Sequence, residues 1–207
     1  GKFESGFIVP DKLTEGSEME EVYNGAYYLY ATYSRSNEIV AVADFPVIGI
    51  ELDIKESTAG TRVEVRGAGF DDEEEIVFRY DGVQIYPVDG EVESDKYGEF
   101  TCAIVIPQST KGSHLITAED ESRNKARVEF AVRSEIILAP MLSSPNTEVT
   151  VTGTGFSSES NVTIYFSDYE QVRDETNEKG SFETTLVVPL TPPNIYEIKA
   201  VDSEGNT

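Results

Sequence analysis

Residues 98–107 of this chain read GEFTCAIVIP, and two other segments follow the same pattern. Residues 1–10 read GKFESGFIVP and residues 180–189 read GSFETTLVVP, so the copies start 97 (98 − 1) and 82 (180 − 98) residues apart. In each copy, apolar or small residues return at every second position after the Gly-x-Phe start, which is the period of a strand with one buried face. A strand pattern that returns at so long a period predicts an array of small β domains.

The middle copy contains a full set of strand-like segments separated by turn residues. Alternating apolar positions, such as Val63 and Val65 or Phe100 and Cys102, place one face of each segment in a core. The expected strands are residues 50–56, 61–67, 75–80, 91–95, 99–106, 113–119 and 125–132. Short strands in this number and spacing are typical of an immunoglobulin-like sandwich. We therefore predict an all-β chain of tandem immunoglobulin-like β-sandwich domains, with Cys102 as a small core residue.

The copies divide the chain into three expected domains of unequal completeness. Residues 48–133 form a complete sandwich, whereas residues 134–207 form one that lacks its last strand, the counterpart of residues 125–132. Residues 1–47 hold the C-terminal half of a repeat. Its strands are expected at residues 2–9, 27–33 and 38–47. This half carries a ten-residue insert, in which SEME at residues 17–20 is a capping box for one helical turn.

Both ends of the chain are thus expected to be incomplete sandwiches. The sequence starts and stops inside a repeat, so we expect it to be a piece of a longer array whose neighbouring repeats complete the two ends. Head-to-tail self-association, with the first segment of one molecule docked on the last domain of another, is a second way to complete them. Frayed or locally rearranged ends are the third outcome.

Short motifs recur in register between the copies. GAGF at residues 67–70 matches GTGF at residues 153–156, and His114 to Asp120 matches Tyr196 to Asp202 through the pattern His/Tyr-x-Ile-x-Ala-x-Asp. These motifs, with the Gly-x-Phe strands and a Gly-Asn turn, resemble the Ig-like repeats of large bacterial and archaeal cell-surface proteins. The IPT/TIG-type domains are a related comparison. The resemblance implies the sandwich fold, and it implies a stalk, an adhesin or a wall-associated module at the cell surface.

The chain is strongly acidic. It has 16 Lys and Arg against 39 Asp and Glu, which gives a formal net charge of −23 at pH 7. This charge repels nucleic acid and anionic lipid, because both need basic side chains to displace their counterions. The single cysteine excludes an intrachain disulfide. We therefore expect a surface protein with no nucleic-acid partner and no membrane span in this fragment.

Five consecutive acids, DDEEE at residues 71–75, lie between two expected strands. A multidentate cation would relieve their mutual repulsion, so Asp71, Asp72 and Glu73 are candidates for weak Ca²⁺ binding. The matching residues of the last copy, 157–161, read SSESN, and no Asp-x-Asp-x-Asp-Gly loop occurs in the chain. A solvated acidic loop is the alternative interpretation. We expect no other cofactor.

Two other polar or glycine-rich motifs are interpreted as turns. Asp120 with Asn124, and Asp202 with Asn206, bracket tight turns in which the Asx side chains cap the backbone, with Ca²⁺ binding as the alternative. The paired glycines of GAGF and GTGF lead from one strand into another strand. They therefore lack the helix dipole of a phosphate loop and are expected to allow a β-bulge or a sharp corner.

His114 is the only histidine, and it aligns with Tyr27 and Tyr196 in the other copies. No carboxylate, cysteine or second histidine lies at a spacing that would make it a metal ligand or a catalytic base. Since Cys102 is expected in the core, the common hydrolase combinations have no candidate. We therefore expect no enzyme and no catalytic residue.

The first segment is rich in tyrosine, and alternation along its strand places Tyr28 and Tyr30 on one face and Tyr27 and Leu29 on the other. Exposed rings on a sheet can stack on sugars or contact a partner protein, so Tyr28 and Tyr30 are the ligand-binding candidates. The alternative is that the rings cover a neighbouring domain or the missing half of the first copy. Separately, NVT at residues 161–163 matches an N-glycosylation acceptor.

These observations favour a non-enzymatic stalk or spacer module of an extracellular, cell-surface protein, with neighbouring repeats as its partners. The alternative is an adhesion or carbohydrate-binding module that uses the Tyr-rich first segment to bind a glycan or a protein.

Overall fold

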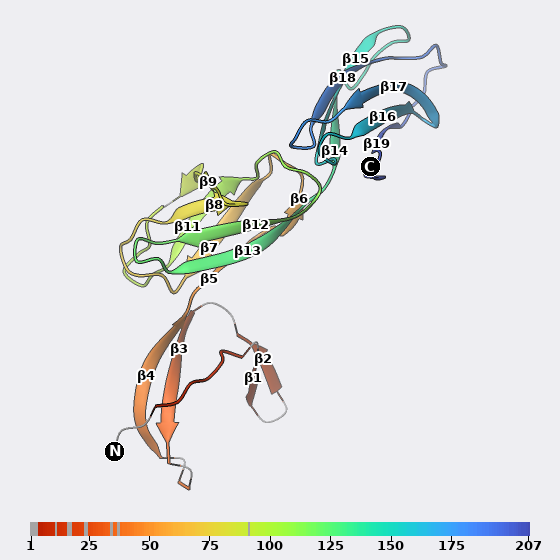
Figure 1. Cartoon of the computed structure of the whole chain (residues 1–207). Helices are drawn as coiled ribbons and strands as arrows, with labels where there is room; N and C mark the ends of the chain where they lie inside the picture. Colours follow the sequence, from red (N-terminus) through yellow and green to blue (C-terminus); the bar gives the residue numbers. More distant parts are fainter. Residues whose placement is uncertain are drawn as a thin grey trace.

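The computed structural model describes residues 4–207 except residues 11, 16–17, 23–24, 34, 37 and 91. All regular structure in the described residues is β-strand, with no helix. Figure 1 shows three parts in a row, which we call the N-terminal ribbon (β1–β4), the middle sandwich (β5–β13) and the C-terminal sandwich (β14–β19). The predicted all-β fold class is confirmed.

The N-terminal ribbon consists of two antiparallel hairpins. They are built from β1 (Lys12–Glu15), β2 (Glu18–Glu21), β3 (Gly25–Thr32) and β4 (Ile39–Val47). β3 and β4 correspond to the expected strands 27–33 and 38–47. Tyr27 lies opposite Phe45, in the same register that places His114 opposite Phe130 in the middle sandwich. The β3–β4 hairpin is therefore the counterpart of the last hairpin of the middle sandwich.

Two predictions for the first segment are wrong. The expected helical turn is a hairpin instead, because β1 and β2 pair from Lys12 opposite Glu21 to Glu15 opposite Glu18. Cross-strand bonds satisfy the backbone there, whereas a single helical turn would carry the full cost of nucleation. The expected strand at residues 2–9 is not formed over residues 4–9, and residues 1–3 lie outside the described part. Its counterpart β11 is held by neighbouring strands, and the described part of the ribbon offers no such neighbour for this segment.

The middle sandwich has a four-stranded sheet, in the order β10-β11-β7-β5, and a five-stranded sheet, in the order β6-β13-β12-β8-β9. Its strands are β5 (Gly49–Leu52), β6 (Glu56–Ser57), β7 (Arg62–Ala68), β8 (Val77–Tyr80), β9 (Val83–Ile85), β10 (Asp89–Gly90), β11 (Phe100–Val105), β12 (Gly112–Glu119) and β13 (Lys125–Val132). All pairs are antiparallel except β6 with β13.

Two expected strands of the middle repeat differ from the structure. The segment 50–56 is not one strand, because the chain leaves one sheet after Leu52 and enters the other at Glu56, so that each sheet gains an edge strand. The segment 91–95 contributes only an isolated bridge between Glu93 and Glu75. The edge of the four-stranded sheet is occupied by β10, which pairs with Ala103 and Cys102 of β11.

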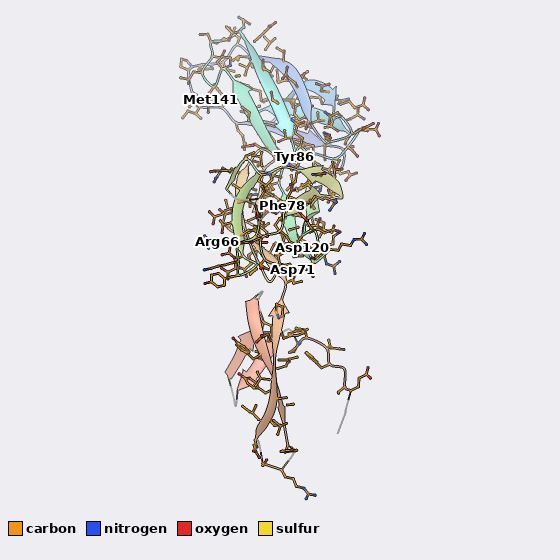
Figure 2. All side chains as sticks on the ribbon, turned by 90° about the vertical axis from the view of Figure 1, so that its left-hand side faces the viewer. Arg66, Asp71, Phe78, Tyr86, Asp120 and Met141 are labelled. Atoms are coloured by element: carbon orange, nitrogen blue, oxygen red, sulfur yellow. The ribbon has the colours of Figure 1, made fainter. Side chains whose placement is uncertain are left out.

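The core of the middle sandwich lies between its two sheets. The alternating residues predicted for it are buried, including Val63, Val65, Phe100 and Cys102. Figure 2 shows Phe78 inside this sandwich. Burial raises the pKa of the Cys102 thiol to about 12, which makes it a packing residue and not a nucleophile.

The C-terminal sandwich repeats this plan with fewer strands. Its strands are β14 (Glu135–Ala139), β15 (Glu148–Thr154), β16 (Asn161–Phe166), β17 (Tyr169–Glu175), β18 (Phe182–Val187) and β19 (Ile198–Asp202). They form two three-stranded sheets, in the orders β14-β15-β18 and β17-β16-β19, around a separate buried cluster.

The recurring Phe of each Gly-x-Phe strand packs against the first glycine of the GAGF or GTGF motif. A Cβ built on Gly67 would lie 2.2 Å from the ring of Phe100, and one built on Gly153 would lie 2.0 Å from the ring of Phe182. These two glycines are therefore required by the ring that covers them. The third Phe, Phe3, lies outside the described residues.

Candidate functional site

Tyr28 and Tyr30 form an exposed aromatic pair on β3. Their side chains are 58% and 57% exposed, and their ring centroids lie 6.5 Å apart with the planes inclined at 36°. Alternation along the strand brings them to one face, as predicted. Two adjacent rings at this spacing present a flat apolar surface with polar hydroxyls, which suits stacking on a sugar ring or a protein side chain. We call this surface the β3 tyrosine pair.

The other face of the ribbon corresponds to the core face of a sandwich. Phe45 lies on that face, opposite Tyr27, and contacts Phe7 with ring centroids 5.4 Å apart. Tyr28 and Tyr30 lie one and three residues after Tyr27 on the same strand and therefore point to the opposite face. The tyrosine pair therefore does not lie on the face that would pack against the other sheet of a sandwich. Tyr33 is also exposed, whereas Tyr23 lies outside the described residues.

The predicted calcium ligands are only partly brought together. Carboxylate oxygens of Asp71, Glu74 and Asp120 lie within 4.8 Å of one another, but Asp72 and Glu73 do not join this group. Asp71 and Asp120 lie at the end of the middle sandwich that faces the N-terminal ribbon (Figure 2). Sequence reasoning named Asp120 only in its own turn and did not place it beside Asp71, because the two residues are 49 positions apart in the chain. Within the acidic run it named Asp72 and Glu73 where the structure uses Glu74.

The carboxylates of this acidic cluster already accept hydrogen bonds from the protein. Asp120 accepts from the amides of Asn124 and Asp71, at 2.7 and 3.1 Å. Glu74 accepts from the backbone and hydroxyl of Ser122, at 2.8 and 2.7 Å. These contacts tie the acidic loop to the 120–124 turn. Oxygen ligands suit a hard cation, and weak Ca²⁺ binding at this cluster remains a prediction.

The same turn anchor recurs in the C-terminal sandwich without the acidic cluster. Asp202 accepts from the amides of Ser157 and Asn206, both at 2.8 Å, as Asp120 does from its counterparts. Burial acts to raise the pKa of Asp202, but its hydrogen bonds from Ser157 and Asn206 outweigh burial and lower the pKa. The predicted Asx turns are therefore present, and each also fixes the loop that follows a GAGF or GTGF motif.

His114 has a partner that its sequence spacing did not reveal. Its Nδ1 lies 2.6 Å from a carboxylate oxygen of Asp81, and its Nε2 lies 2.7 Å from the carbonyl oxygen of Thr110. The ring also stacks on Tyr80, with centroids 5.2 Å apart. Both nitrogens thus face acceptors inside the fold. This arrangement ties His114 of β12 to Asp81, which follows β8, and to Thr110, which precedes β12.

The second glycine of each GAGF or GTGF motif lies against the backbone of the connection that enters the sandwich. Gly69 has φ +83°, and a Cβ there would lie 2.8 Å from the carbonyl oxygen of Val47. Gly155 has φ +73°, and a Cβ there would lie 2.4 Å from the carbonyl oxygen of Arg133. Ser134 also donates a hydrogen bond to the carbonyl oxygen of Gly155 at 2.8 Å. We call these two contacts the glycine joints; at each of them a glycine of positive φ directly follows a strand and lies close to the entering backbone.

Asn161 of the glycosylation triplet is exposed at the start of β16. Within the described residues, no helix could cross a membrane.

No protein-family model matches the chain, and no curated protein matches it. Among solved structures it is similar to the adhesin InvE of Yersinia pseudotuberculosis, with 9% identity over 77% of this chain and 56% of that one, and a TM-score of 0.34. It is also similar to SGBP-B of the Bacteroides ovatus mixed-linkage glucan utilization locus, solved with a mixed-linkage heptasaccharide, with 16% identity over 91% of this chain and 51% of that one, and a TM-score of 0.34.

A third similar structure is the central fibronectin-III array of RIM-binding protein, with 9% identity over 79% of this chain and 60% of that one, and a TM-score of 0.28. The chain thus spans about half the length of the first two structures. Identities and TM-scores this low carry no argument about function.

Proposed function

We propose that this chain is a non-enzymatic stalk or spacer module of an extracellular, cell-surface protein. The observation that carries the proposal is the glycine joint, which occurs twice. In both places a short connection, Val47 to Gly49 or Val132 to Glu135, enters the next part of the chain beside a glycine of positive φ. A connection built the same way at successive junctions is a device for holding successive domains in line.

The contacts at the second joint support limited bending. Arg133 and Ser134 are the whole connection between β13 and β14, and their backbone lies against Gly155. On the other side of the junction, Gln108 of the middle sandwich lines one shallow surface depression with Thr152 and Asn177 of the next. A two-residue connection packed on both sides leaves little freedom for rotation.

The charge of the chain fits the same role. A formal net charge of −23 keeps an extended array soluble and discourages contact with nucleic acid and anionic lipid. Two residues support the non-enzymatic role. Both ring nitrogens of His114 already face acceptors within the chain, and Cys102 is buried.

The stalk role is tested by the rigidity of the second joint. Residual dipolar couplings of the full chain should fit one alignment tensor for the middle and C-terminal sandwiches together. A variant with Gly-Ser-Gly-Ser inserted after Ser134 should need two tensors, because the insert separates the connection from Gly155. Two independent tensors in the unaltered chain would contradict a rigid spacer and refute the proposal.

A second candidate function is favoured by one specific observation, the β3 tyrosine pair. Its two rings are more than half exposed and adjacent, on a face that the described residues leave uncovered. An adhesion or carbohydrate-binding role would use this surface to stack on a glycan or a protein partner. This candidate is compatible with the stalk role, because the pair lies on the ribbon and not at a glycine joint.

Glycan-array binding separates the two functions. If the tyrosine pair binds a glycan, Tyr28→Ala and Tyr30→Ala should each abolish the signal. Tyr86→Ala and Tyr169→Ala are matched controls, since each removes a tyrosine that is 75% exposed elsewhere on the chain. Absence of binding by the unaltered chain, or equal loss in the controls, would remove the carbohydrate-binding candidate.

A further inference from the structure

The only histidine of the chain, His114, lies beside the second joint. It lines a cavity of about 340 Å³ together with residues of the β11–β12 loop and with Glu178 and Lys179 of the C-terminal sandwich. Gln108 of that loop also lines the shallow depression that the two sandwiches share. The loop, residues 107–111, thus contributes to both cavities at this junction, so its position affects how the two sandwiches meet.

Side chains hold this loop in place. Among the described residues, residues 108–111 form no backbone–backbone hydrogen bond. Instead, the hydroxyl groups of Tyr80 and Ser109 lie 2.7 Å apart. The second contact joins Nε2 of His114 to the carbonyl oxygen of Thr110, also at 2.7 Å. Loss of either contact would therefore leave the loop held by only one of them.

The His114 ring makes both of its hydrogen bonds only when it carries two protons. Its Nδ1 lies 2.6 Å from the carboxylate of Asp81, and its Nε2 faces the carbonyl of Thr110, so both partners are acceptors. A neutral imidazole has one N–H donor, and its other nitrogen then presents a lone pair to an oxygen. The Asp81 carboxylate also accepts from the amide of Leu115 at 2.9 Å, which fixes it beside Nδ1. The proton that leaves is therefore that of Nε2, because the negative charge of Asp81 retains the other.

The C-terminal sandwich makes the same contact with a different side chain. Tyr196 aligns with His114, and its hydroxyl donates at 3.0 Å to the carbonyl oxygen of Pro192, four residues earlier in the chain. Thr110 likewise lies four residues before His114. The ring of Tyr196 also packs on a ring at the end of the neighbouring strand, Phe166, with centroids 4.8 Å apart. The two sandwiches thus share this contact, and only the middle one makes it with a histidine.

The other titratable groups around His114 come from the end of β8, the turn that follows it and the turn between β17 and β18. Those that line the same cavity are Tyr80, Asp81, Glu178 and Lys179. Burial raises the pKa of Tyr80 to about 12, so its hydroxyl stays neutral beside the ring. On the other side, β13 places the uncharged Phe130 opposite His114. Of these side-chain types, only histidine ordinarily changes its charge near neutral pH.

We propose that the protonation state of His114 controls the stiffness of the second joint. When both ring nitrogens carry a proton, Nε2 donates to Thr110 and keeps the 107–111 loop in its place beside the C-terminal sandwich. When the pH rises and Nε2 loses its proton, the loop keeps only its Ser109 contact and the joint gains freedom. The stiffening is therefore present at low pH and is lost as the pH rises. This inference rests on the proposed stalk function, because it names what regulates that stalk.

The test compares the unaltered full chain at about pH 5.5 and at about pH 8.5, a range in which histidine side chains titrate. Residual dipolar couplings of methyl groups are measured, because they do not depend on amide protons that exchange rapidly at the higher pH. The middle and C-terminal sandwiches should fit one alignment tensor at the lower pH and need two at the higher pH. One tensor at both pH values would overturn this proposal and leave the stalk function standing. Two tensors already at the lower pH would refute the stalk function and this inference with it.

Two variants should remove the pH dependence by different routes. His114→Tyr supplies the hydroxyl donor that Tyr196 uses in the other sandwich. In Asp81→Asn, the new amide group donates to Nδ1, so a neutral ring carries its proton on Nε2 and keeps the Thr110 contact. Both variants should therefore fit one tensor at both pH values. Glu178→Gln changes a charge at the same cavity and should behave like the unaltered chain. Two tensors at the higher pH in either folded variant, or one tensor there in the control, would overturn the proposal.

The ring itself provides a measurement that does not depend on domain motion. Nitrogen-15 signals of the His114 side chain should show both nitrogens protonated at the lower pH, with the proton of Nε2 alone lost at the higher pH. The methyl signal of Thr110 should shift over the same pH interval, because its carbonyl loses a donor. Loss of the Nδ1 proton instead, or a Thr110 signal that does not follow the ring, would overturn the proposal even if a variant misfolds.

Discussion

The middle and C-terminal sandwiches share one strand arrangement but differ in the pairing of one strand. In the middle sandwich, β12 is paired on both sides, by β8 and β13. In the C-terminal sandwich, the equivalent β19 is paired only with β16 among the described strands. The recurring Phe, the two motif glycines and the Asx turn are alike in both. The difference therefore isolates what one strand contributes to burial in this fold.

The ring at the centre of each core gives the largest expected effect. Phe100→Ala should destabilise the middle sandwich by about 3–5 kcal/mol, the usual cost of deleting a buried ring. Phe100 contacts the rings of Phe70 and Phe78, whereas Phe182 contacts that of Phe156. We therefore expect Phe182→Ala to lie at the lower end of this range. Urea unfolding followed by NMR signals of each sandwich measures both, and a change within about 1 kcal/mol for Phe100→Ala would show that its ring is not central to the core.

The glycine joint gives the next effect. Gly155→Ala should cost about 2–3 kcal/mol, because a left-handed residue becomes strained and its Cβ would press on the carbonyl oxygen of Arg133. Gly205→Ala is the matched control, since Gly205 also has a positive φ but has nothing within 4 Å of the added Cβ. Thermal unfolding compares the two. Equal losses would mean that the contact with the connection contributes nothing.

The carboxylate of Asp202 makes the stability of the C-terminal sandwich depend on pH. The folded pKa of Asp202 is lowered, so the unfolded chain binds more protons in the window between the folded and unfolded values. This stabilising contribution is complete above the unfolded pKa of about 3.9 and is lost as the pH falls through the folded pKa. Melting temperatures measured from pH 6 to pH 2 should fall in that window. Asp202→Asn should flatten the fall, and Glu135→Gln should leave it unchanged; an unaltered profile in Asp202→Asn would contradict the assignment.

The smallest expected effect is that of calcium on the middle sandwich. Any binding at Asp71, Glu74 and Asp120 should be weak, because the carboxylates of Glu74 and Asp120 already accept protein hydrogen bonds. Calorimetry should show no sub-micromolar affinity, and millimolar Ca²⁺ should raise the melting temperature only slightly. Glu74→Gln should remove that rise. An unchanged melting temperature in the unaltered chain would eliminate calcium as a ligand.

Much of the fold could be predicted from local patterns. The alternation around Phe100, the strand segments near β12 and β13, and the shared face of Tyr28 and Tyr30 all follow from a period of two. The errors arose where pairing partners decide the outcome. A polar stretch such as Glu18–Glu21 has no strong preference of its own, so cross-strand bonding with Lys12–Glu15 made it a strand. Residues 4–9 have a strand pattern but no partner strand to hold them.

The sequence by itself determined the period, the repeat and the face on which each side chain lies, because these depend on residues close together in the chain. Only the tertiary structure brought Asp81 to His114, Asp120 to Asp71, and the backbone of Arg133 to Gly155, since each pair is separated by 22 residues or more. Such contacts depend on how sheets pack and where connections cross.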